Sequence, residues 1–130
     1  MKLRIRGNSI RLRLLQAEVK ALGQHEQIIE TTRLGPTPED TLTYGLGTHP
    51  TKEPVLTQWA GQSLLVTISE DLATDLVETQ RVSICENILF DDAVLKVLIE
   101  KDFKCLTSRA GEDESDNFEN PQETHLCGAN

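Results

Sequence analysis

The sequence of 130 residues lacks the features by which most membrane proteins and many enzymes are recognised. Its apolar runs are short, and no charged segment followed by an apolar one opens the chain, so we expect neither a membrane span nor a secretory signal. There is no Gly-x-Ser-x-Gly elbow, Walker loop, dinucleotide fingerprint or His-Glu-x-x-His motif. We therefore expect a cytoplasmic protein with no membrane partner and, on balance, no enzymatic activity.

Cysteines are few as well. Cys85, Cys105 and Cys127 form an odd set with wide spacing. In a chain without an expected secretory signal, this pattern predicts reduced thiols rather than a disulfide framework. Cys85 lies in a segment that has the composition of a strand, and we expect it to be a small core residue.

The chain has no net positive charge, but its basic residues are concentrated near the N-terminus. The chain carries a formal charge of −8, yet residues 1–20 hold six Lys or Arg and a single acidic residue. A globally acidic domain repels a polyanion at long range, which argues against general nucleic-acid binding. A plain explanation of the uneven charge is that the two ends of the molecule attract each other.

The most informative segment that is present covers residues 1–14, where two alternating runs flank Gly7-Asn8-Ser9. Strand side chains alternate between two faces, so this pattern predicts a β-hairpin with one apolar and one basic face. The apolar set is Leu3, Ile5, Ile10, Leu12 and Leu14. The basic set, called the basic face below, is Lys2, Arg4, Arg6, Arg11 and Arg13.

The remainder of the first 101 residues predicts an α+β fold, mainly an antiparallel sheet or an open barrel with two short helices. One helix is expected over 16–23, ending at a glycine, and the second opens at Ser69, whose hydroxyl suits an N-cap. Further strands are expected over residues 27–33, 41–46, 55–60, 63–68, 82–87 and 94–101. The segments 35–40 and 47–54 contain prolines and are expected to be loops.

The two halves of the chain have similar patterns. A shift of 54 positions aligns Ser9 with Ser63, Leu12 with Val66 and Leu22 with Leu76. This weak signal allows either an internal pseudo-repeat or two similar supersecondary units. The predicted consequence is a pseudo-symmetric sheet or open barrel with a helix closing each end.

Residues 1–107 are predicted to form a single domain, and residues 108–130 an acidic, partly disordered tail. The tail is rich in Glu, Asp, Asn and Gly, so it buries too little apolar surface to offset its chain entropy. Phe118 is its one large anchor. We expect Phe118 to anchor the tail, and the acidic run 112–116 to fold back onto the basic hairpin.

The segments MKLRIRGNSIRLRL, EKDFKCL and EDESDNFENP occur in this order near the two ends of the chain. In these segments the sequence resembles an uncharacterised family of small bacterial proteins, known as a domain of unknown function. The resemblance implies a bacterial, soluble, single-domain protein and no catalytic residues. Leu15 departs from it, because a Thr or Ser that caps the following helix is expected there.

The basic face is the first candidate site. Basic side chains at alternate positions present their heads to one surface and could bind phosphate or another anion. The face superficially resembles the charged strands of triphosphate-tunnel enzymes, but their Glu-x-Glu-x-Lys signature is absent. The alternative is a solvated strand face, on which Arg and Lys discourage edge-to-edge association.

The second candidate is a metal site in the C-terminal region. His125 and Cys127 are two residues apart, and Cys105 could supply a third ligand for zinc or iron. The alternative is that these residues bind no metal, because no Cys-x-x-Cys knuckle accompanies them. His25 and His49 are expected to be surface residues rather than ligands.

No arrangement of side chains predicts catalysis. The acidic pairs Asp91-Asp92 and Glu70-Asp71 suit a turn and a helix start, and catalytic carboxylates require a shared, perturbed environment that no local pattern indicates. We expect a small binding or interaction protein with a protein partner. The alternatives are a metal-binding protein that uses the C-terminal Cys and His, and a small phosphate- or anion-binding enzyme that uses the basic face.

Overall fold

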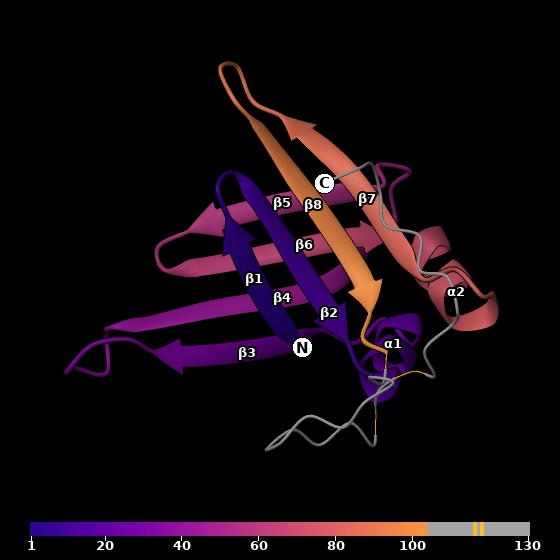
Figure 1. The fold of residues 1–130 in the computed structure, drawn as a ribbon, viewed down its shortest axis with the longest axis horizontal. Coiled ribbons are helices and arrows are strands. Elements are labelled where there is room, and N and C mark those ends of the chain that lie inside the picture. Colours follow the sequence, from indigo (N-terminus) through magenta and orange to yellow (C-terminus); the bar gives the residue numbers. More distant parts are fainter. Residues whose placement is uncertain (104–115, 117, 119–130) are drawn as a thin grey trace.

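A computed structural model describes residues 1–103, 116 and 118, and these form two stacked four-stranded β-sheets and two short helices (Figure 1). The elements in chain order are β1 (Lys2–Arg6), β2 (Ser9–Leu14), α1 (Gln16–Gly23), β3 (Ile28–Arg33), β4 (Thr41–His49), β5 (Val55–Ala60), β6 (Ser63–Ser69), α2 (Glu70–Glu78), β7 (Ser83–Leu89) and β8 (Val94–Lys101). Every predicted element is present. The one boundary that differs notably is β4, which continues through Gly47 to His49 into the segment expected to be a loop.

Each sheet is antiparallel at its edges and parallel at its centre. Sheet A has the order β1-β2-β8-β7 and sheet B the order β3-β4-β6-β5. The central pairs β2 with β8 and β4 with β6 run parallel, and all other pairs are antiparallel. The α+β class with mainly antiparallel sheets is therefore confirmed, and the sheets do not close into a barrel.

The strand order repeats between the halves of the chain. Each half contributes two strands, a helix and two further strands, and the order β1-β2-β8-β7 becomes β5-β6-β4-β3 when the halves are exchanged. This arrangement fits the pseudo-repeat suggested by the sequence. The expectation that the helices close opposite ends is wrong, because α1 and α2 contact each other at the same end of the molecule (Figure 1).

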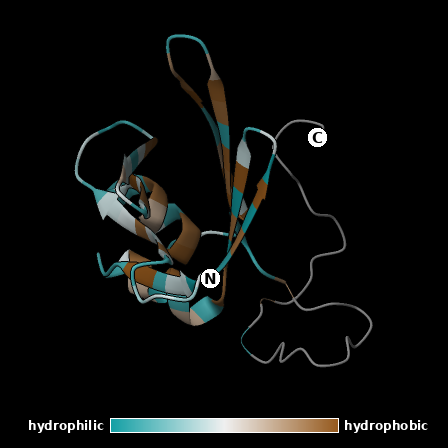
Figure 2. Ribbon diagram, turned by 90° about the vertical axis from the view of Figure 1, so that its left-hand side faces the viewer, coloured by the Kyte–Doolittle hydropathy of each residue, from teal (hydrophilic) through white to brown (hydrophobic). Residues whose placement is uncertain are grey.

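The core lies between the two sheets and beneath the helices. Alternate strand residues point into it, which is why apolar and polar segments alternate along the strands in Figure 2. The largest fully buried side chains are Leu12, Leu14, Leu22, Leu46, Val66, Ile68, Leu76, Ile84, Val97 and Ile99. Leu22 of α1 and Leu76 of α2 are equivalent under the shift of 54 positions, and both are core residues.

The N-terminal hairpin forms as predicted. Leu3 pairs with Leu12 and Arg4 with Arg11 across its two strands, so the apolar set faces sheet B and the basic face points away from it. Gly7 adopts a φ of 54° in the turn, a conformation that an L side chain rarely takes. The register that places all five basic side chains on one surface therefore depends on this turn.

The two helices begin with different caps. In α2 the Ser69 hydroxyl accepts a hydrogen bond from the Leu72 amide at 3.2 Å, as the sequence predicts. In α1 the N-cap is Leu15, which has no capping oxygen, and the Glu18 carboxylate instead accepts from the Leu15 amide at 2.9 Å. Glu18 thus makes one half of a capping box, and a Thr or Ser at position 15 would have supplied the other half.

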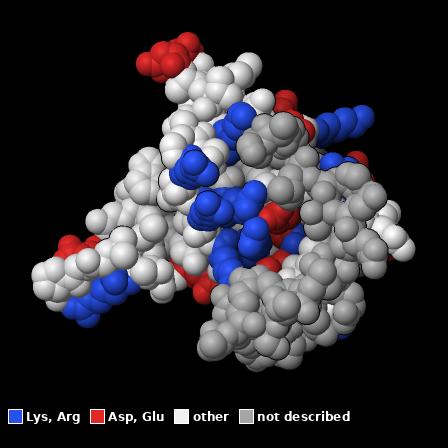
Figure 3. Space-filling model, viewed as in Figure 1, with Lys and Arg blue, Asp and Glu red and all other residues white. Residues whose placement is uncertain are grey.

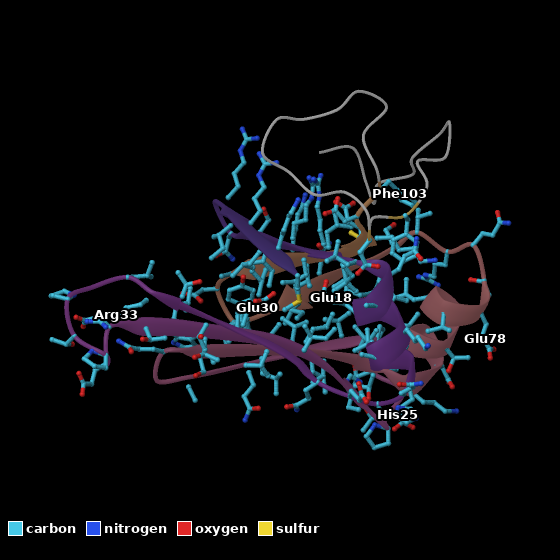
Figure 4. The ribbon with its side chains drawn as sticks, turned by 90° about the horizontal axis from the view of Figure 1, so that it is seen from below. Glu18, His25, Glu30, Arg33, Glu78 and Phe103 are labelled. Atoms are coloured by element: carbon cyan, nitrogen blue, oxygen red, sulfur yellow. The ribbon has the colours of Figure 1, made fainter. Side chains whose placement is uncertain are left out.

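Glu18 also holds the amino terminus. The Met1 ammonium is buried, donates to Glu18, and donates to Glu30 at 2.9 Å. Figure 4 shows these two glutamates near each other, one on α1 and one on β3. Burial alone would lower the pKa of this amine, but the hydrogen bonds and negative charges of both carboxylates outweigh it, so the pKa is raised above 8.0. The amine therefore ties β1, α1 and β3 together.

Phe118 packs against the end of β8. Its ring lies edge to face against Phe103 with 5.7 Å between the ring centroids, and the Lys101 ammonium lies 5.0 Å from the Phe118 centroid. Its amide donates to the Asp102 carbonyl at 2.7 Å, while Asp116 accepts from the first turn of α1. The expected anchor is confirmed, and it attaches beside α1. The acidic run 112–115 and the proposed tail boundary lie outside the described residues.

Replacing Phe118 by alanine should lower the free energy of unfolding by about 1.5 kcal/mol, the low end for a large apolar side chain, because Phe118 is only partly buried. Chemical denaturation at pH 7 measures this. Phe90→Ala is the matched control, since the Phe90 ring is 52% exposed at the β7–β8 turn, and it should change stability far less. Equal effects of the two substitutions would contradict a specific anchor at Phe118.

Candidate anion-binding site

The outer face of sheet A, the face turned away from sheet B, carries a regular grid of side chains. The pairing registers give three rows across β1, β2, β8 and β7. The rows are Arg6, Ser9, Lys96 and Asn87; then Arg4, Arg11, Leu98 and Cys85; then Lys2, Arg13, Glu100 and Ser83. The basic face therefore occupies two strands of this grid, and β8 and β7 supply the remainder.

At one end of the grid the positive charges are neutralised by buried acids. Glu100 lies 2.8 Å from the Arg13 Nε and 3.4 Å from the Arg11 Nε, and its side chain is only 8% exposed. Asp102 is equally buried and lies 3.3 Å from the Lys2 ammonium. Both acids follow Leu98 at alternate positions, so the strand geometry places them under the basic side chains.

At the other end the positive charges have no such partner. Arg4, Arg6 and Lys96 are exposed and form no ion pair with any residue in 1–103, 116 or 118. Arg4 also stands directly across from Arg11, and like charges at opposed positions of an antiparallel pair are destabilising. These three residues, which lie beside Arg11, are called the cationic end. A bound anion would relieve the repulsion within it.

The cationic end surrounds a hollow of about 720 Å³. Its floor is low because Ser9 is the small side chain between Arg6 and Lys96, and its hydroxyl donates to the Arg6 carbonyl at 2.7 Å. Gly7 and the exposed amide side chain of Asn87 complete the rim. Figure 3 shows the resulting basic surface over β1 and β2, with acidic atoms at its lower margin.

Part of this site could not be predicted from the sequence. Lys96, Asn87, Glu100 and Asp102 join the basic face only because β8 pairs in parallel with β2, some 87 positions earlier in the chain. The alternation of side chains along β8 predicts which of its residues share a face. Nothing in the sequence near β8 indicates that this face adjoins the basic face of the N-terminal hairpin.

Cys85 corrects two expectations. It is disulfide-bonded, so the prediction of reduced thiols is wrong for this residue. It is also only partly buried, on the outer face beside Leu98, whereas its neighbour Ile84 fills the core. The sequence could not predict the bond, because the spacing of cysteines along a chain does not define which of them meet in space.

The proposed metal ligands Cys105, His125 and Cys127 lie outside the described residues and stay a prediction. Among the residues that the structure describes, no group of three or more His, Cys, Asp or Glu side chains could hold a metal ion. His25 is exposed near Thr48 and Glu70, and His49 hydrogen-bonds to the Thr67 hydroxyl at 2.8 Å. Both histidines therefore have contacts of an ordinary structural kind.

The acidic pairs lie where the sequence placed them. Asp91-Asp92 forms the turn between β7 and β8, and Glu70-Asp71 opens α2. The two pairs lie on separate elements, and none of the four residues lines the hollow on the basic surface. The grid on sheet A is therefore the candidate site that the described part of the chain offers.

These features define a class of α+β domain in which two stacked sheets present a basic outer face with buried acids at one end. A family model covers residues 1–122, and the chain belongs to that family, which is described as a family of unknown function, DUF7009. No curated protein matches the chain, and no solved structure matches it. Within the described residues, no helix is long and apolar enough to cross a membrane.

Proposed function

We propose that this protein is a non-enzymatic binding module that holds a small, multiply charged anion of the phosphate class on the outer face of sheet A. The observation that carries the proposal is the cationic end, where Arg4, Arg6 and Lys96 surround a hollow without an acidic partner among the described residues. Guanidinium groups match the paired oxygens of phosphate well. A bacterial, cytoplasmic setting is part of the same proposal.

The spacing of the cations favours an anion with more than one phosphate group. Arg6 and Lys96 stand on strands separated by β2, which corresponds to about 9.5 Å between their backbones. Arg4 and Arg6 are separated by about 6.6 Å along β1. Two linked phosphates can bridge the hollow and pair with all of these side chains, whereas a single phosphate would require all three to converge on it.

Long-range electrostatics favour a small anion over a nucleic acid. The chain carries a net charge of −8, so a long polyanion is repelled by most of the molecular surface. A small anion experiences mainly the local field of the cationic end. The buried Glu100 and Asp102 limit the site on one side, because an anion placed over them would meet negative charge.

Pyrophosphate tests the proposal by thermal unfolding at low ionic strength. At ten times its dissociation constant it should stabilise the native state by about 1.4 kcal/mol, which corresponds to a rise in Tm of about 5 °C. The double variant Arg4→Ala, Arg6→Ala should lose this rise. The variant Lys20→Ala, Lys52→Ala removes the same charge from exposed positions outside the site and should keep it.

Two results would overturn the proposal. One is an equal rise in Tm for the wild type and the Arg4, Arg6 variant. The other is a rise that sodium chloride reproduces at the same ionic strength, because that would reflect general charge screening rather than a site.

A further inference from the structure

The four edge strands of the two sheets differ in charge. β1 carries Lys2, Arg4 and Arg6, β3 carries Glu30 and Arg33, and β7 carries Glu86. β5, with the sequence VLTQWA, carries no charged residue and no proline. Proteins commonly protect exposed edges with charges, because an unprotected edge is a template for another strand. Among the described edges, only β5 lacks this protection.

The backbone groups on the free side of β5 follow from its pairing with β6. The Ser69 amide donates to the Pro54 carbonyl at 3.1 Å, so Pro54 bonds toward β6. Bonding groups alternate along an antiparallel strand, which directs the N–H and C=O groups of Val55, Thr57 and Trp59 toward the free side. No backbone hydrogen bond to these groups is found among the described residues outside the β5–β6 ladder.

Apolar side chains accompany this free edge. Trp59 is 64% exposed and Leu56 is 42% exposed. Trp59 also lines a hollow of about 480 Å³ together with Leu34, Pro36 and Leu42. Exposed apolar side chains beside unpaired backbone groups are the combination used when an extended peptide joins a sheet.

The β7–β8 hairpin lies on the same side of the molecule as this edge. β7 contacts β5, and Figure 1 shows the tip of the hairpin extending beyond β5. Ile88 and Leu95 on this hairpin share the face that looks toward sheet B and are only partly buried. A strand added to β5 would run along the side on which these apolar residues lie.

We propose that the free edge of β5 receives an extended, non-acidic peptide segment of a partner protein as a fifth strand of sheet B. The backbone of the segment would pair with Val55, Thr57 and Trp59, and its apolar side chains would pack beside Trp59. An acidic segment is disfavoured because the chain carries a net charge of −8 and Glu86 lies on the inner face of β7 without a described ion-pair partner. This surface is separate from the basic outer face of sheet A.

Trp59 provides a direct measurement, because it is the only tryptophan of the chain. The probe is a short, acetylated and amidated peptide of alternating valine and threonine with one central lysine. Titrated into the full-length protein, it should shift the Trp59 emission to shorter wavelength with a dissociation constant at or below about 1 mM. A matched peptide with glutamate in place of lysine should bind at least about fivefold more weakly.

Thr57→Pro removes the backbone N–H of residue 57 from the free edge without removing a backbone hydrogen bond to β6. Proline is tolerated on such edges. This variant should bind the probe at least about tenfold more weakly. The matched control Thr57→Val keeps the donor and the shape, and its affinity should equal that of the wild type. A probe methylated on alternate amide nitrogens repeats the test on the unaltered protein, and it should not bind.

The proposal is overturned if the probe causes no shift at millimolar concentration, if the methylated probe binds equally well, or if both peptides bind with the same affinity. It is also overturned if the Trp59 emission changes with protein concentration alone, since a second copy of the chain would then occupy the edge. None of these outcomes bears on pyrophosphate binding, which is measured on a different face.

Discussion

Replacing Glu100 by glutamine is expected to lower the free energy of unfolding by about 3 kcal/mol and, in the same protein, to strengthen anion binding. Glu100 is the buried carboxylate that pairs with Arg11 and Arg13. Breaking a buried ion pair is costly because it leaves uncompensated charge. The expected loss lies at the low end of the usual range, because both arginines retain some exposure to water.

The gain in binding follows from the released arginines. Without Glu100, Arg11 and Arg13 join Arg4 and Arg6 as free cations on the outer face of sheet A. Urea denaturation measures the loss in stability, and calorimetric titration with pyrophosphate measures the gain in affinity. Glu86→Gln makes the same change of charge on the opposite face of sheet A and should have neither effect. A Glu100 variant that is destabilised but binds pyrophosphate more weakly would contradict the assignment of the site.

Replacing Glu18 by glutamine should lower the free energy of unfolding by about 1.5–3 kcal/mol at pH 7. Glu18 both caps α1 through the Leu15 amide and holds the buried Met1 ammonium. The glutamine side chain can still accept a hydrogen bond from the Leu15 amide and keep the cap. The expected loss is therefore that of the charged hydrogen bond to the Met1 ammonium, which costs about 1.5–3 kcal/mol. The control is Glu26→Gln, an exposed residue just after α1 without a described ion pair, for which little change is expected.

The Met1 ammonium also predicts a pH dependence. Its pKa in the folded protein is raised above the ordinary value of 8.0, so its contribution is fully present below pH 8. It is lost as the pH rises through the higher folded pKa, because the folded state then releases the proton that formed the ion pairs. Denaturation curves between pH 7 and pH 10 should show wild-type stability falling toward that of Glu18→Gln. A constant difference between the two proteins would contradict this ion pair.

Local patterns in the sequence predicted the elements of the fold well. The alternation over residues 1–14, the glycine turn at Gly7 and the Ser69 cap each depend on interactions between near neighbours, and all three are confirmed. The arrangement of these elements in space was harder to predict from the sequence. The parallel pairing of β2 with β8 joins segments at opposite ends of the domain, and its stability comes from the shared core rather than from either segment alone.

The same limit explains the candidate site. The five basic residues of the hairpin were predictable, because one strand pair defines their common face. Their division into a neutralised end and a cationic end was not, because Glu100 and Lys96 arrive on β8. The bonded state of Cys85 was missed because the spacing of cysteines along a chain does not define which of them pair.

The most direct test of the binding site is a titration of the isotopically labelled protein with pyrophosphate, followed through its backbone amide NMR signals. We expect saturable shifts that centre on Arg4, Arg6 and Lys96 and on Ser9 between them, and unchanged signals in β5 and β6 of sheet B. Shifts that are spread evenly over the surface, or that centre on sheet B, would show that the cationic end of sheet A is not the anion site.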